Sequence, residues 1–138
     1  MTDQHFDVVP VGSVESPLAD LSQAPNQGDA GAPPAWLVFE SRFADAVRDL
    51  HVGDRVIVVT WLHRARRDVL RTYPGDDPSG PVLGVFSLRA PDRPNPIGLH
   101  RVRILTVDGL RILVDALEVL NGTPILDVKP VLDPKAER

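Results

Sequence analysis

Residues 99–116 read LHRVRILTVDGLRILVDA, and the fold class can be inferred from them. Two apolar runs, residues 99–107 and 110–116, flank the pair Asp108 and Gly109. An Asp-Gly pair between two apolar runs is the strongest short-range signal for a β-hairpin. This stretch therefore predicts two neighbouring antiparallel strands.

Further strands are predicted on both sides of the hairpin. Residues 55–62 (RVIVVTWL) are nearly all apolar and β-branched, which indicates a deeply buried strand. Apolar residues recur at helical spacing from Ser41 to about Leu50, which predicts one short helix. Shorter strands are expected at residues 6–14, interrupted by Pro10, and at 36–40, 82–88 and 125–128. The pattern favours a mainly β fold, a small closed antiparallel β-barrel with one short helix and long loops, because closure removes exposed sheet edges.

The composition fits a single domain over residues 1–138, with its core at about residues 6–131. Hydrophobic residues make up 43% of the 138, so a folded core is expected. The absence of cysteine excludes a disulfide framework, a thiolate zinc site and a cysteine nucleophile. We find no apolar run of membrane-spanning length and no signal peptide in MTDQHFDVV, so a cytoplasmic protein is expected.

The formal net charge of −4 conceals an uneven distribution. Residues 55–103 carry nine arginines against four acidic residues, a local net charge of +5. Residues 1–54 carry −7 and residues 104–138 carry −2. An anionic partner is expected to bind the basic middle segment.

Several common functional motifs are absent. The sequence holds no GxGxxG or GxxxxGK[ST] phosphate loop, no HExxH metal motif and no GxSxG nucleophile elbow. Its four histidines show no metal-ligand spacing, so no metal is expected. Any active site must therefore come from less familiar constellations.

Residues 84–98, GVFSLRAPDRPNPIG, form the first of these constellations. Three closely spaced prolines fix the backbone and make a rigid ledge after a predicted strand. Asn95 lies between two of the prolines, and Arg89 and Arg93 flank the ledge. Such a loop is suited to hold a small molecule or nucleotide, or it is a stiffened barrel corner with solvated arginines.

Residues 117–130, LEVLNGTPILDVKP, form the second, with polar and apolar positions alternating. Glu118 is the more suggestive acid, because a carboxylate near an arginine loop accepts a ribose diol or offsets a cationic ligand. Asp127 and Lys129 share one face of an extended chain, and a plain surface ion pair is favoured for them.

Residues 63–71, HRARRDVLR, form the third. The arginines at 64, 66, 67 and 71 make a compact cluster, which fits either phosphate contacts or a solvated face. His63 is either a ligand contact or a core histidine.

The first two constellations, in this order and at this spacing, resemble the TsaA-like family, also called the TrmO type or YaeB-like. Its pattern runs roughly GVFATRSPFRPNPIG and then LD-LLDGTPVLDIKPY, and VPVGSVESP near the N-terminus also resembles the family's first strand and turn. The resemblance covers residues 6–131. It implies a small β-barrel that binds S-adenosylmethionine, works as a homodimer and methylates N6 of threonylcarbamoyl-adenosine beside the anticodon of threonine-type, ANN-decoding tRNA.

The resemblance also implies roles for particular residues. Cofactor contacts would fall on Gln27, Gly28, His63, Arg64, Arg89, Leu99, Ala116, Leu117 and Glu118. RNA contacts are expected from Arg66, Arg67, Arg71, Arg93 and Asn95. No catalytic residue is assigned, and Asp127 and Asn95 are the candidates.

The chain departs from the family pattern at several positions. The family's Asp in DGTP is Asn121, the aromatic before RPNP is Asp92, and KPY ends in Val131. The C-terminal extension of longer bacterial members is expected to be missing. Two alternatives therefore stay open, a barrel that methylates another RNA or a small molecule, and a non-catalytic sensor of S-adenosylmethionine.

Overall fold

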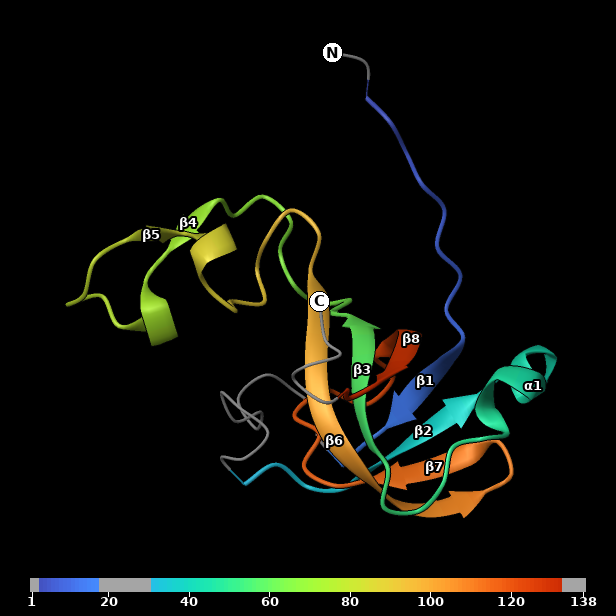
Figure 1. Ribbon diagram of the computed structural model, residues 1–138. Coiled ribbons are helices and arrows are strands. Elements are labelled where there is room, and N and C mark those ends of the chain that lie inside the picture. Colours follow the sequence, from blue (N-terminus) through green and yellow to red (C-terminus); the bar gives the residue numbers. More distant parts are fainter. Residues whose placement is uncertain (1–2, 18–30, 133–138) are drawn as a thin grey trace.

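A six-stranded antiparallel barrel forms the body of the computed structural model, which describes residues 3–17 and 31–132. The strands follow one another around the barrel in the order β1-β2-β7-β6-β3-β8, and β8 pairs with β1 to close it (Figure 1). Their bounds are Gly12–Glu15 (β1), Ala35–Phe39 (β2), Arg55–Trp61 (β3), Ile97–Asp108 (β6), Arg111–Val114 (β7) and Pro124–Pro130 (β8). This confirms the predicted mainly β fold.

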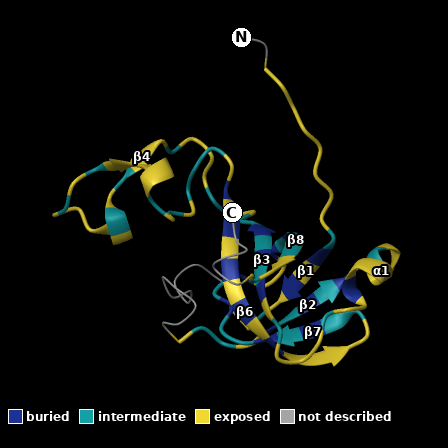
Figure 2. Ribbon diagram, viewed as in Figure 1, coloured by how far each residue is buried: buried dark blue, intermediate teal, exposed yellow. Residues whose placement is uncertain are grey.

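The barrel interior is filled by alternate side chains of its strands. In β6 the buried positions are Gly98, His100, Val102 and Ile104, and the positions between them are exposed. Successive side chains of a strand point to opposite faces, so this alternation places one set inside. Figure 2 shows the buried residues concentrated in the barrel strands. The largest fully buried apolar side chains include Leu37, Ile104, Ile112, Leu117 and Ile125.

Residues 62–96, here called the lobe, leave the barrel between β3 and β6 and project from one end of it (Figure 1). The lobe contains a two-stranded sheet of β4 (Arg71–Thr72) and β5 (Leu83–Gly84). Single 3-10 turns occur at Pro74–Asp76 and Val85–Ser87. The lobe is much more exposed than the barrel (Figure 2), so its shape depends on polar contacts.

Three sequence-based predictions need correction. The strand expected at residues 6–14 is shorter: β1 begins at Gly12, and its backbone bonds to neighbouring strands begin at Val11, directly after Pro10, which lacks a donor for the ladder. Residues 82–88 are not a buried strand, since only Leu83–Gly84 pairs, within the lobe. The helical segment is shorter than expected, a 3-10 turn at Ser41–Phe43 followed by α1 at Ala44–Val47.

Candidate functional site

The basic cluster and the proline ledge, separate in the sequence, pack together where the lobe meets the barrel. The Arg66 amide donates to Asp92 Oδ1 at 2.8 Å, and the Arg93 amide donates to the Arg66 carbonyl at 3.0 Å. Arg67 donates to the Pro94 carbonyl at 2.8 Å and to Asn95 Oδ1 at 3.1 Å. The Arg67 guanidinium also lies over the Trp61 ring, 5.1 Å from its centroid. Asp92 and Arg67 therefore fix the ledge to the start of the lobe.

Arg93 holds the other side of the ledge. Its guanidinium donates to the carbonyls of Leu88, Ala90 and Val85 at 3.0, 2.9 and 2.8 Å. Charged hydrogen bonds of this kind are stronger than neutral ones. Arg93 was predicted to contact RNA, but three of its donors are used on the backbone of the lobe.

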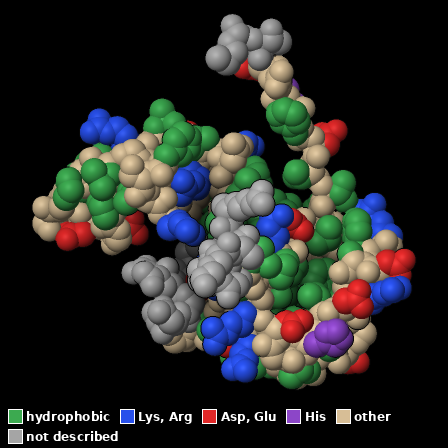
Figure 3. Space-filling view, viewed as in Figure 1, with side chains coloured by type: hydrophobic (Ala, Val, Ile, Leu, Met, Phe, Trp, Pro, Cys, Tyr) green, Lys and Arg blue, Asp and Glu red, His purple; other side chains and the backbone are tan. Residues whose placement is uncertain are grey.

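Arg71 and Arg89 have more freedom to contact a ligand than the other lobe arginines. Both side chains are exposed, and neither has a hydrogen bond or ion pair within the described residues. Arg66 is paired with Asp68 at 3.0 Å, and this hydrogen bond and charge hold the pKa of the Asp68 carboxyl below its usual value. Figure 3 shows Lys and Arg side chains on the lobe and along its junction with the barrel.

A chain of three polar side chains lies in the barrel wall next to the lobe. His100 of β6 makes a 2.8 Å hydrogen bond through Nε2 with Thr60 Oγ1 of β3. Its Nδ1 lies 2.9 Å from Glu118 Oε1. Thr60 and His100 are buried, whereas the Glu118 side chain is 21% exposed. Among the described residues Glu118 Oε2 has no hydrogen-bond partner, so the chain ends in a carboxylate oxygen that is open to a ligand.

The backbone packs tightly against these three side chains. A Cβ at Gly98 would lie 2.6 Å from both His100 Nε2 and Thr60 Oγ1, so only glycine leaves room for their hydrogen bond. The register of β3 against β8 shifts between Val59 and Thr60, a bulge that re-aims side chains at this end of the barrel.

The segment that carries Glu118 is held in an unusual conformation. Ala116 has a φ of 43°, in the left-handed region that non-glycine residues rarely adopt. The amide of the fully buried Leu117 donates to the Pro33 carbonyl at 3.1 Å. The residues just before β2 thus lie against the segment Ala116–Glu118, which is predicted to hold a cofactor.

Two polar residues of the second constellation have structural partners. Asn121 Oδ1 accepts a hydrogen bond from the Ser16 amide at 3.0 Å, a bond that the family's aspartate would make equally well. Asp127 and Lys129 form an exposed ion pair at 3.1 Å, as the shared face predicted.

The remaining predicted cofactor residues are not gathered into one pocket. His63 and Arg64 are exposed at the start of the lobe, and Leu99 is 52% exposed on the outer face of β6. Gln27 and Gly28 lie outside the described residues.

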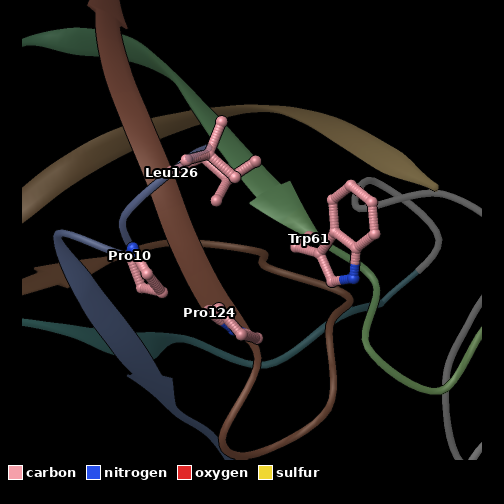
Figure 4. Close-up of a pocket in the computed structure, with 5 residues that line it drawn as sticks. Pro10, Trp61, Pro124 and Leu126 are labelled. Atoms are coloured by element: carbon pink, nitrogen blue, oxygen red, sulfur yellow. The ribbon is translucent and has the colours of Figure 1, made fainter. Parts of the chain in front are cut away.

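One pocket in the described residues has a volume of about 200 Å³ and is lined by none of the predicted cofactor residues. It is lined by Val8, Pro10, Trp61, Pro124 and Leu126 (Figure 4). These side chains come from the N-terminal arm and from the ends of β3 and β8. The second pocket, between α1 and β8, also lies apart from Glu118.

Sequence reasoning missed Thr60 and His100. The signal was present, because His100 alternates with outward-facing arginines and Thr60 follows Val56 and Val58 on the inward face of β3. A polar residue at an inward position needs a partner, and that requirement could have singled out both.

The described residues contain no group of His, Cys, Asp or Glu that could hold a metal ion. None of their helices is long and apolar enough to span a membrane.

The fold and the sequence motifs agree with one family of proteins. The family model described as the tRNA-methyltransferase O N-terminal domain matches residues 13–135, and the chain belongs to this family. A protein of Rhizobium radiobacter named probable S-adenosyl-L-methionine-binding protein VirR is 40% identical over 120 residues, covering 87% of this chain and 67% of its own length. A probable S-adenosyl-L-methionine-binding protein of Methanothermobacter thermautotrophicus is 39% identical over 130 residues, covering 94% and 93%.

The solved structures give the same result. The crystal structure of TrmO from Pseudomonas aeruginosa superposes with a TM-score of 0.76 at 28% identity, over 99% of this chain and 59% of that one. The chain thus spans little more than half the length of that TrmO.

Proposed function

We propose that this protein binds S-adenosylmethionine at the barrel end that carries Glu118 and methylates tRNA, with N6 of threonylcarbamoyl-adenosine as the acceptor. The observation that carries the proposal is the Glu118 carboxylate. Its Oε1 is hydrogen-bonded to His100, and its Oε2 has no partner among the described residues. Family membership and the names of the relatives support the choice of ligand.

Glu118 and two exposed residues, Leu99 and Arg89, have the chemistry that the proposed cofactor needs. An ionised carboxylate accepts hydrogen bonds from ribose hydroxyls and attracts a sulfonium cation. The exposed Leu99 side chain offers apolar surface for an adenine ring, and the exposed Arg89 offers a partner for a carboxylate. When bound, S-adenosylmethionine supplies an activated methyl group on a good leaving group.

The chain's own contribution is then mainly alignment. The ledge is rigid because prolines fix it and Arg67 and Arg93 tie it to the lobe. Such rigidity lets the protein hold an acceptor base in a fixed position, which lowers the entropic part of the barrier. Neither Asp127, paired with Lys129, nor Asn95, bonded to Arg67, is assigned as a proton acceptor.

Arg71 is proposed as the principal RNA contact of the lobe, with Arg64 and Arg66 beside it. Their exposure supports this choice over Arg93, whose guanidinium is engaged. Neutralising a phosphate contact lowers affinity and reduces its dependence on salt. Joint Arg66→Ala and Arg71→Ala substitution should therefore lower tRNA affinity and the salt slope, while Arg48→Ala, at the end of α1, should change neither.

We also propose a homodimer. Support comes from apolar side chains exposed on the outer face of β6, Ile97 and Leu99, and from Phe86 of the lobe. Sedimentation at several protein concentrations tests it, and a monomer at all concentrations would refute it.

The proposed cofactor site is tested by calorimetric titration with S-adenosylmethionine and with S-adenosylhomocysteine, which lacks the positive charge on sulfur. Glu118→Gln should weaken the first about 10-fold or more, since hydrogen bonds to charged groups contribute about 1.5–3 kcal/mol. The control, Asp127→Asn, exchanges another carboxylate for an amide and should leave affinity unchanged. An equal loss for both ligands assigns Glu118 to the ribose, and a loss confined to S-adenosylmethionine assigns it to the sulfonium. Unchanged affinity for both would contradict the assigned site.

A non-catalytic sensor is the second candidate, favoured by the engagement of both candidate catalytic side chains. Methyl transfer from labelled S-adenosylmethionine to any acceptor in cell extract would exclude it. Transfer to a small molecule, with tRNA unlabelled, would instead identify a different substrate.

A further inference from the structure

Glu118 is the outer end of a hydrogen-bonded chain whose inner members are Thr60 and His100. We infer that Thr60 and His100 are positioning residues that hold the Glu118 carboxylate with Oε1 turned inward and Oε2 turned toward the cofactor. This inference rests on the proposed function, because it takes the barrel end as the cofactor site.

The hydrogen-bonding chemistry assigns a direction to the chain. An ionised carboxylate can only accept, so the 2.9 Å contact requires the proton on His100 Nδ1. In the neutral imidazole Nε2 is then an acceptor, and the Thr60 hydroxyl donates to it across 2.8 Å. The acceptor-only carboxylate thereby selects the tautomer, and the Thr60 hydroxyl, which can donate or accept, holds the ring from its other side, much as hydrogen-bonding partners orient metal-binding histidines.

The surroundings leave the imidazole little freedom. Thr60 is fully buried, His100 is nearly so, and the backbone of Gly98 lies directly against their hydrogen bond. Because the inner end of the chain is closed at Thr60, a path for protons to solvent through it is disfavoured. The open end is Glu118 Oε2, which points to orientation of a ligand group as the task of the chain.

A purely structural role makes a different prediction. If the three side chains only satisfied one another, a substitution would lower stability without a matching loss of affinity in the folded protein. If they position Glu118, loss of the Thr60 hydroxyl lets the imidazole and the carboxylate adopt other orientations. Affinity for the cofactor then falls even where the protein is fully folded.

The test compares Thr60→Val, which keeps the shape of the side chain and removes the hydroxyl, with Thr60→Ser, which keeps the hydroxyl. Val56→Ala on the same strand is the control for lost stability, since Val56 is buried and takes no part in the hydrogen bonds of Thr60, His100 and Glu118. Affinity for S-adenosylmethionine is measured by calorimetry under conditions where each variant is fully folded. Thr60→Val should bind about 5- to 10-fold more weakly, the effect of one hydrogen bond of about 1 kcal/mol. Thr60→Ser and Val56→Ala should bind within about 2-fold of wild type.

Nitrogen-15 NMR of the ligand-free protein supplies a readout that does not depend on the cofactor. The His100 ring should show the Nδ1–H tautomer in wild type and in Thr60→Ser, and a mixture of tautomers in Thr60→Val. A wild-type ring protonated on Nε2 alone would overturn the inference, as would equal affinities of Thr60→Val and wild type. A loss of affinity in Val56→Ala equal to that in Thr60→Val would also overturn it. Failure of the wild-type protein to bind S-adenosylmethionine at all would instead refute the proposed function, and the NMR result would still stand.

Discussion

Replacing Arg93 by lysine should loosen the lobe while leaving the barrel folded. The guanidinium donates to three carbonyls at 2.8 to 3.0 Å, whereas the single ammonium of lysine cannot reach all three in this geometry. One of them belongs to Val85, which is 2% exposed, so water does not readily replace the lost donor. A net cost of about 3–6 kcal/mol follows for two lost charged hydrogen bonds, at about 1.5–3 kcal/mol each.

Hydrogen exchange of the lobe amides measures this cost locally. The amides of Val85 and Leu88 are bonded to the Leu70 and Val85 carbonyls and report on the segment that Arg93 holds. Since about 1.4 kcal/mol corresponds to a factor of ten, these amides should exchange roughly 100- to 20,000-fold faster in Arg93→Lys. The amide of Val58 in β3 should keep its wild-type rate.

The matched control is Arg71→Lys, the same exchange at an arginine of the lobe whose side chain has no hydrogen bond within the described residues. It should leave all of these rates unchanged. Equal exchange rates in the two variants would show that Arg93 does not hold the lobe, and the rigid ledge would lose its main support.

Three further predictions follow from single features. Ala116→Gly should stabilise the protein by about 0.5–1 kcal/mol in chemical denaturation, because it relieves a left-handed alanine, and a destabilised variant would contradict this. Gly98→Ala should lower the free energy of unfolding by about 1–3 kcal/mol or more in the same assay, since the new methyl group overlaps the hydrogen bond between Thr60 and His100. An unchanged free energy of unfolding would show that these two side chains can move aside. In an NMR titration the Asp68 carboxyl should titrate below its usual pH and return toward it in Arg66→Ala. The depressed pKa means that the pair's small contribution to stability is present above the ordinary carboxyl pKa and is lost as pH falls through the pKa of Asp68 in the folded protein. An unchanged titration midpoint of Asp68 in Arg66→Ala would show that Arg66 is not the cause of the shift.

The barrel could be predicted because its signals are local. The Asp-Gly pair predicted a hairpin, and in the structure Asp108 pairs with Arg111 across it. Residues 82–88 were mistaken for a barrel strand because an apolar run does not say which strand it pairs with. In the structure Leu83–Gly84 pairs within the lobe and Val85–Ser87 forms a 3-10 turn.

The candidate site was harder to predict because its contacts join distant parts of the chain. Thr60 and His100 are 40 positions apart, and Arg67 and Asn95 are 28 apart. Neither pairing has a local sequence signature. Glu118 was singled out as a carboxylate near an arginine loop, but its hydrogen-bonding partner is a histidine of β6 that only the barrel brings close.

Mass spectrometry of tRNA nucleosides tests the central proposal most directly, in the source organism with this gene deleted and then restored. Loss of the methylated threonylcarbamoyl-adenosine, restored by the wild-type gene and not by a Glu118→Gln version, is the result that we predict. An unchanged nucleoside profile after deletion would contradict the proposed reaction on tRNA.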